Sequence, residues 1–154
     1  MKKIFIVGSV TGTTEAQKQK FSIYEKVAQQ FYPTAIIDTP QTIMNYRDRY
    51  ITQNREASER QVLQAMVNYD MQEIMSSELI LCDATLRSFG VGMELATAKR
   101  YHIPVIFFAE KGADVSKMIL GAFEKSFVHF YKNDEDLENI LYQVLGETKS
   151  EKIS

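Results

Sequence analysis

The chain has 154 residues, a length that suits one domain able to bury most of the surface that its unfolded form exposes. Its 18 lysines and arginines nearly balance 20 aspartates and glutamates, which excludes a strongly basic face for general nucleic-acid binding. One cysteine, Cys82, excludes an internal disulfide, and together with two histidines it is too little for a metal site. We therefore expect a small-molecule ligand, no nucleic-acid partner, no metal and no cofactor.

The chain begins with two lysines and a short apolar run that ends in glycine, Lys3–Gly8. Its apolar part is shorter than the ~7–15 residues of an export signal, so we expect a cytoplasmic protein with no membrane partner. A short apolar run of this kind is typical of a strand buried on both faces, as in a parallel sheet. The segment therefore predicts the first, central strand.

The next part of the chain predicts a helix, a short strand and a mixed segment. A turn rich in glycine and hydroxyl residues over 8–14 precedes apolar residues that recur at helical spacing from Glu15 to Tyr32. Ala35–Asp38 then predicts a second strand. The segment 39–60 is polar and aromatic by turns and predicts helix and loop over the site. There, a solvated helical face is favoured over a lid of arginines.

A clearer helix is predicted from Ser58 to Ser76, with Asp70 near the middle of its apolar stripe. A carboxylate at such a position is costly to bury without a partner. It is either an aspartate bonded to a neighbouring backbone amide or a carboxylate with a raised pKa at a functional site. The apolar positions that define the stripe are Leu63, Met66, Val67, Met71 and Ile74.

The stretch around which the chain is organised begins with the apolar run Leu79–Cys82, a predicted strand that breaks at Asp83 into a polar turn and then a helix. Ligands of open α/β sheets bind at such places, outside the carboxyl end of a strand and at a helix N-terminus. Ser88, Gly90 and Gly92 suit a loop that wraps an anion. Glu94 would repel a phosphate unless it faced another part of the ligand, so the stretch predicts a site with two jobs.

The remaining elements complete an α/β fold. They are a helix with Val91, Leu95, Ala98 and His102 on its buried face, a strand over 104–109, a short helix over 115–123 with Ser116 in its first turn, a strand over 127–131, and a helix capped by Asn133. Strand and helix alternate about five times, which predicts a five-stranded parallel sheet with helices on both faces. This is the three-layer sandwich of Rossmann-like or flavodoxin-like proteins. We expect a single domain over 1–147 and a flexible polar tail over 148–154.

The sequence Ser-Phe-Gly-Val-Gly-Met-Glu-Leu at 88–95 resembles the signature of the 2′-deoxynucleoside 5′-phosphate N-hydrolases, within the nucleoside 2-deoxyribosyltransferase superfamily. Three further features agree with that family. Gly8-Ser9 closes the first strand, Asp70 lies 24 residues before Glu94, and the segment 115–119 resembles the second serine segment of the family. The resemblance covers about residues 3–123 and is weakest over 39–60.

The resemblance implies cleavage of the N-glycosidic bond of a nucleoside 5′-monophosphate. Glu94 would be the nucleophile that traps the sugar covalently, Asp70 would assist the departing base, and water would release the sugar phosphate. Ser9, Ser88 and Ser116, with backbone N–H groups of the loop over 88–92, would bind the 5′-phosphate. For the two later serines, helix capping is nearly as good an interpretation, and both roles can coexist. The resemblance also implies a homodimer or a higher homo-oligomer.

The resemblance also places Gly8 in the implied substrate site. The chain departs from the family pattern at two other positions of this site. Phe5 stands where the family has a tyrosine, which removes a hydroxyl near the 2′ side of the sugar and leaves room for a 2′-hydroxyl. Thr11 stands where the family has an arginine, and Arg87, Arg47 or Arg49 could replace that charge. We favour a deoxynucleotide substrate narrowly, with hydrolysis of a cytidine-type ribonucleotide as the alternative.

Two other functions stay open. A deoxyribosyltransferase that moves the sugar between free bases would share the glutamate but needs no phosphate pocket, so Ser88 and the glycines after it favour the hydrolase. A nucleotide-binding sensor without catalysis would not need both Asp70 and Glu94, although the changes at Phe5 and Thr11 keep this alternative open.

Overall fold

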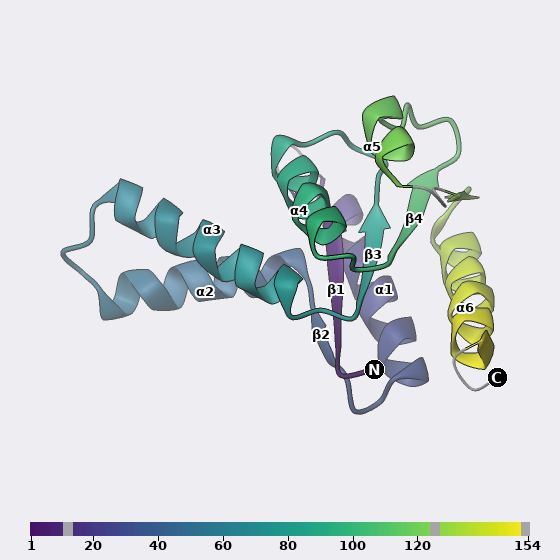
Figure 1. The fold of residues 1–154 in the computed structure, drawn as a ribbon, viewed down its shortest axis with the longest axis horizontal. Helices are drawn as coiled ribbons and strands as arrows, with labels where there is room; N and C mark the ends of the chain where they lie inside the picture. Colours follow the sequence, from purple (N-terminus) through teal and green to yellow (C-terminus); the bar gives the residue numbers. More distant parts are fainter. Residues whose placement is uncertain (11–13, 124–126, 152–154) are drawn as a thin grey trace.

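A computed structural model describes residues 1–10, 14–123 and 127–151. Five strands form one sheet in which every neighbouring pair is parallel, in the order β2-β1-β3-β4-β5 (Figure 1). The predicted α/β fold with a five-stranded parallel sheet is therefore confirmed. The strands are β1 (Lys3–Gly8), β2 (Ile36–Asp38), β3 (Leu79–Asp83), β4 (Val105–Glu110) and β5 (Val128–Tyr131).

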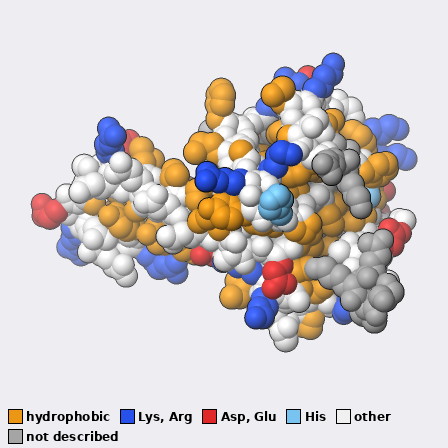
Figure 2. Space-filling model, in the orientation of Figure 1, with side chains coloured by type: hydrophobic (Ala, Val, Ile, Leu, Met, Phe, Trp, Pro, Cys, Tyr) orange, Lys and Arg blue, Asp and Glu red, His pale blue; other side chains and the backbone are white. Residues whose placement is uncertain are grey.

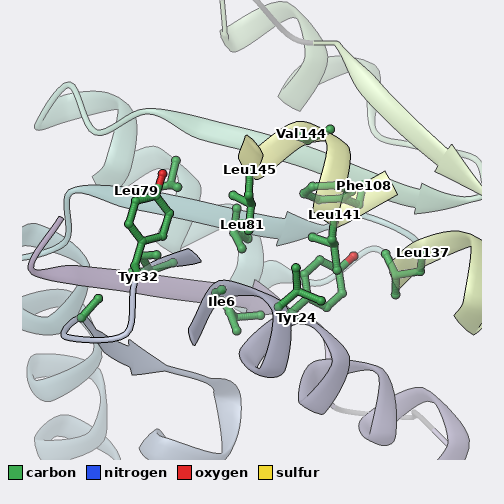
Figure 3. Close-up of a cluster of buried hydrophobic side chains, with 14 of the residues drawn as sticks. Ile6, Tyr24, Tyr32, Leu79, Leu81, Phe108, Leu137, Leu141, Val144 and Leu145 are labelled. Atoms are coloured by element: carbon green, nitrogen blue, oxygen red, sulfur yellow. The ribbon is translucent and has the colours of Figure 1, made fainter. Parts of the chain in front are cut away.

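Helices cover both faces of the sheet, because alternate strand residues point to opposite sides. On one face, α1 (Glu15–Phe31) and α6 (Asp134–Glu151) bury a cluster that includes Tyr24, Leu81 and Phe108 (Figure 3). On the other face, α4 (Phe89–Arg100) and α5 (Lys117–Ala122) pack on a second cluster that includes Phe5, Cys82 and Phe107. Cys82 is fully buried, as its place in an apolar run predicted.

The segment predicted as helix and loop, together with the helix after it, forms an arm of two helices, α2 (Pro40–Gln53) and α3 (Glu59–Met75). Figure 1 shows the arm projecting beyond the edge of the sheet. The predicted apolar stripe of α3 is wrong for the outer half of the arm, where Leu63 and Val67 are 53% and 45% exposed. The outer turns of α3 lie beyond the sheet, so among the described residues only α2 is available to cover them. At the inner end of the same helix, Ile74 is buried.

Two helix ends differ from the prediction. His102 was expected on the buried face of α4, but it is exposed and lies past the end of the helix, with a φ of 56°. Helix α6 was expected to end at 147, and it continues to Glu151, through four residues of the predicted polar tail. Its last turns are held by Thr148, which donates to the Val144 carbonyl, and by Lys149, which donates to the Phe31 carbonyl. Asn133 caps the start of this helix, as predicted, by accepting from the Asp136 N–H.

Candidate active site

The candidate site lies where the strand order reverses. β1 and β3 are neighbours in the middle of the sheet, and Gly8 at the end of β1 is in register with Asp83 at the end of β3. Chains leave these two strands in opposite directions, which opens a crevice at their carboxyl ends. A Cβ atom at Gly8 would lie 2.5 Å from the Phe21 ring of α1, so a larger residue there would force this ring to move.

Asp70 of α3 and Glu94 of α4 meet in the interface between these two helices. The interaction of the two carboxyl groups affects the pKa of both. One turn further along, the Thr97 hydroxyl lies 3.1 Å from the Met71 sulfur, so the same faces of α3 and α4 stay in contact. The packing of α3 against α4 thus places two residues 24 positions apart in the sequence side by side.

Burial controls the protonation of this pair. Burial raises the pKa of Asp70 to about 6. The charge of Glu73 adds to this rise, and a hydrogen bond from Glu94 opposes it. Burial, followed by the charge of Asp70, raises the pKa of Glu94 well above its usual value. Two carboxyl groups can bond to each other only if one keeps a proton, and the rise in both pKa values favours that protonated form. The buried Oδ1 of Asp70 has no hydrogen-bond partner among the described residues.

A charged cluster lies one helical turn from Asp70. Lys3 at the start of β1 forms ion pairs with Glu73 of α3 and with Asp38 of β2, whose Oδ2 is 3.0 Å from the lysine Nζ. Burial opposes the charge of Lys3, but the two carboxylates outweigh it and raise its pKa. This cluster connects the inner end of α3 with β1 and β2, one turn away from Asp70.

The predicted phosphate residues lie on α4 and near α5. Ser88 is the N-cap of α4, and its hydroxyl accepts from the Val91 N–H at 3.5 Å. Gly90 and Gly92 are in the first turn of this helix, so the prediction that they form a loop is wrong. They allow close access to the helix N-terminus, where the first N–H groups have no partner within the helix. Ser116 is at the N-cap position of α5 and makes no capping bond with its side chain.

Ser88 and Ser116 line the same cavity, which has a volume of about 730 Å³ and lies between α4 and α5. Its lining is mainly apolar and includes Val91, Leu95 and Ile119. Asp70 and Glu94 do not line it, because Glu94 faces α3 on the other side of α4. The structure therefore brings together the two serines and, separately, the two carboxyl groups.

The other predicted site residues have different surroundings. Phe5 is fully buried, on the sheet face that α4 covers. Ser9 is half-buried just past the end of β1, and Thr11 lies outside the described residues. Arg87, a candidate to replace the missing arginine, binds Asp114 instead, with Nη2 2.5 Å from the carboxylate. This ion pair joins the β3–α4 loop to the β4–α5 loop near both serines.

Comparison with known proteins gives three findings. No protein-family model matches the chain. A 5-hydroxymethyl-dUMP N-hydrolase from Esox lucius is 37% identical over 76 residues, which is 47% of this chain and 52% of the relative. The chain thus spans about half the length of that relative.

Solved structures share the fold over nearly the whole chain. A CMP N-glycosidase from Clostridium botulinum is 16% identical with a TM-score of 0.54, covering 93% of this chain and 99% of the other. A 2-desoxiribosyltransferase from Leishmania mexicana is 13% identical with a TM-score of 0.53, covering 92% and 97%. A conserved protein from Enterococcus faecalis V583 is 16% identical with a TM-score of 0.57, covering 93% and 98%. Within the described residues, no helix combines the length and hydropathy that crossing a bilayer requires.

Proposed function

We propose that this chain, which resembles the nucleotide N-hydrolases of the nucleoside 2-deoxyribosyltransferase superfamily, hydrolyses the N-glycosidic bond of (2′-deoxy)nucleoside 5′-monophosphates. The products are the free base and (deoxy)ribose 5-phosphate. The observation that supports this most directly is the partly buried pair of Asp70 and Glu94, whose interaction raises the pKa of Glu94. Cleavage of a glycosidic bond by retaining enzymes needs two carboxyl groups, one as nucleophile and one as acid and base.

The shared proton gives each carboxyl group its role. When substrate binds, the proton moves from Glu94 to Asp70, which leaves Glu94 as a carboxylate. Its oxygen attacks the anomeric carbon while the bond to the base breaks, and Asp70 gives its proton to the departing base. Asp70, again a carboxylate, then takes a proton from water as the water attacks the glycosyl ester. The sugar phosphate leaves, and the pair holds one proton as before.

The 5′-phosphate would bind at the N-terminus of α4, near Ser88 and Ser116. A helix N-terminus directs N–H groups and the positive end of its dipole toward an anion. In this site, Ser9 would approach from the end of β1, since Gly8 and Asp83 are neighbours across the sheet. Glu94 lies in the second turn of the same helix but on its face toward α3, so a nucleotide bound here would run around the α4 N-terminus from the phosphate to the carboxyl pair.

The same region supports a homodimer. Phe89 and Met118, on the rim of the cavity between α4 and α5, are 99% and 84% exposed, and Met93 beside them is more than half exposed. Figure 2 shows hydrophobic side chains on this part of the surface and along the arm. An apolar cavity with an apolar rim is typical of a covered surface. A second copy seated there would close the cavity over the phosphate. A cytoplasmic location stays a prediction.

A panel of ribo- and deoxyribonucleoside monophosphates, with free base measured by chromatography, tests the proposal. We expect release of base from at least one monophosphate and much slower release from the matching nucleoside without phosphate. Glu94→Gln should lower turnover by at least ~1,000-fold, about 4 kcal/mol of barrier, while substrate still binds. Glu56→Gln, in the exposed turn of the arm, is the matched control and should turn over normally. Equal rates with and without phosphate would favour the transferase.

A further inference from the structure

Asp83 is a buried carboxylate that the proposed chemistry does not use. It is the last residue of β3, and its side chain lies on the sheet face opposite Cys82 and Glu94. Three groups donate to it. The Tyr24 hydroxyl of α1 and the Tyr131 hydroxyl of β5 donate to Oδ2 at 3.0 and 2.8 Å, and the Thr85 N–H donates to Oδ1 at 3.0 Å.

The two tyrosines are fixed donors. Tyr24 and Tyr131 are almost fully buried, and burial raises the pKa of both, helped by the negative charge of Asp83. They therefore keep their protons. Packing holds their rings in place, since Tyr24 makes an edge contact with Phe108, with ring centroids 5.4 Å apart. Two fixed phenol groups thus orient the Asp83 carboxylate through Oδ2, and its Oδ1 accepts from the backbone of Thr85.

Thr85 passes this orientation on to the loop before α4. Its hydroxyl accepts from the Glu110 N–H at 2.9 Å and lies 3.3 Å from the Tyr131 hydroxyl. The Ala84 N–H donates to the Phe108 carbonyl at 2.8 Å. The first two residues of the loop are therefore tied to the end of β4, and the chain reaches Ser88 three residues later.

We propose that Asp83 is a positioning residue that sets the place of Ser88 and of the α4 N-terminus through the backbone of Thr85. A buried carboxylate without a cation among its bonding partners is a poor means of stabilising a fold, because apolar groups of similar shape do this as well or better. A carboxylate is, however, suited to holding two hydroxyls and one N–H in a fixed geometry. This role rests on the proposed function, since it concerns how well the loop is prepared for a phosphate.

Tyrosine-to-phenylalanine variants test the role without changing the packing. Tyr24→Phe and Tyr131→Phe each remove one donor to Asp83. Tyr32→Phe is the matched control, because Tyr32 belongs to the same hydrophobic cluster and its buried hydroxyl has no partner among the described residues (Figure 3). Asp83→Asn, which keeps the shape but supplies a donor where an acceptor is needed, is the stronger variant.

We expect the two donor variants and Asp83→Asn to raise KM for the nucleoside monophosphate about five- to tenfold, as the loss of one hydrogen bond implies, with kcat within about twofold. Deuterium exchange of the amides over 84–92 should also become faster without ligand. The control should change neither value. A lower Tm with unchanged KM and unchanged exchange over 84–92 would show a purely structural role and overturn the proposal.

The failure of the proposed function would look different. If the wild type releases no base from any monophosphate, that function is wrong, but exchange over 84–92 still reports on Asp83. In that case, unchanged exchange in Tyr131→Phe overturns the positioning role, and faster exchange there, absent from Tyr32→Phe, supports it.

Discussion

The Glu73 carboxylate lies one helical turn after Asp70 on α3, and its negative charge helps to raise the pKa of Asp70 to about 6. Lys3 pairs with Glu73 on its other side, so the charge is fixed close to the carboxyl pair. The acid that we propose for assisting the departing base is therefore tuned by Glu73, a residue without a role of its own in the proposed reaction.

This relationship predicts a pH effect. In the proposed mechanism the pair holds one proton, so kcat/KM should fall below about pH 6, where Asp70 becomes protonated as well. Glu73→Gln removes the repulsion and should move this acid limb to lower pH. Glu59→Gln, in the exposed first turn of the same helix, should leave the limb in place. An unmoved limb in Glu73→Gln would show that another group controls it.

A second prediction concerns stability. Asp70 and Glu94 both have raised pKa values in the folded state, so the folded chain holds protons that the unfolded chain releases above about pH 4. Their burial therefore costs stability as pH rises from about 4, through the pKa of Asp70 near 6 and on toward that of Glu94. Replacing Glu94 with Gln removes the charge and can still donate to Asp70.

We expect Glu94→Gln to raise the Tm at pH 7.5 by roughly 3 °C or more, since each kcal/mol shifts Tm by about 2–4 °C in a chain of this size. At pH 4, where Glu94 of the wild type is protonated and uncharged like the glutamine, the difference should nearly vanish. Thermal unfolding at the two pH values, with Glu56→Gln as control, measures this. A variant less stable than wild type at pH 7.5 would mean that the ionised pair stabilises the fold.

The order of strands and helices could be predicted because it depends on local patterns. Buried parallel strands have short apolar runs, and helices have apolar residues at helical spacing, so β1, β3 and α1 were placed within one or two residues. The outer half of α3 could not be, because its apolar stripe predicts burial only if something covers it. Whether the sheet covers this stripe depends on the direction in which the arm leaves the sheet, which the local sequence pattern does not indicate.

The candidate site was predictable where its residues share a short stretch of sequence. Ser88 and Glu94 lie on one helix, and Asp70 was noticeable as an acid within an apolar stripe. The bonds of Asp83 to Tyr24 and Tyr131 join residues 59 and 48 positions away, which no local pattern indicates. The sequence does show Asp83 as an acid at the end of an apolar strand, but the partners of this carboxylate depend on the topology of the sheet.

A third prediction tests the proposed homodimer and the surface that we propose for it. Met118→Glu places a charge on the exposed apolar rim between α4 and α5, which would be costly to bury in an interface. We expect light scattering to give twice the chain mass for the wild type and the single mass for this variant. Leu63→Glu, on the exposed outer half of the arm, is the matched control. If only Leu63→Glu dissociates the protein, the arm forms the interface instead.

The last prediction concerns the sugar. Phe5 is fully buried on the sheet face that α4 covers, and it is followed two residues later by Val7, the register partner of Cys82. The charge of Glu94 contributes to the raised pKa of Cys82, so the glutamate lies close to this part of the sheet. A hydroxyl added at Phe5 would need a partner in this apolar environment, and a carboxyl group at the site or the sugar could supply it.

In Phe5→Tyr we therefore expect kcat/KM to shift toward the deoxynucleotide relative to the matched ribonucleotide, because the new hydroxyl occupies room that a 2′-hydroxyl would use. Phe107→Tyr, another fully buried phenylalanine of the same cluster, is the control for the cost of burying a hydroxyl, and it should lower Tm without changing the ratio. Equal ratios in wild type and Phe5→Tyr would show that this position does not select the sugar.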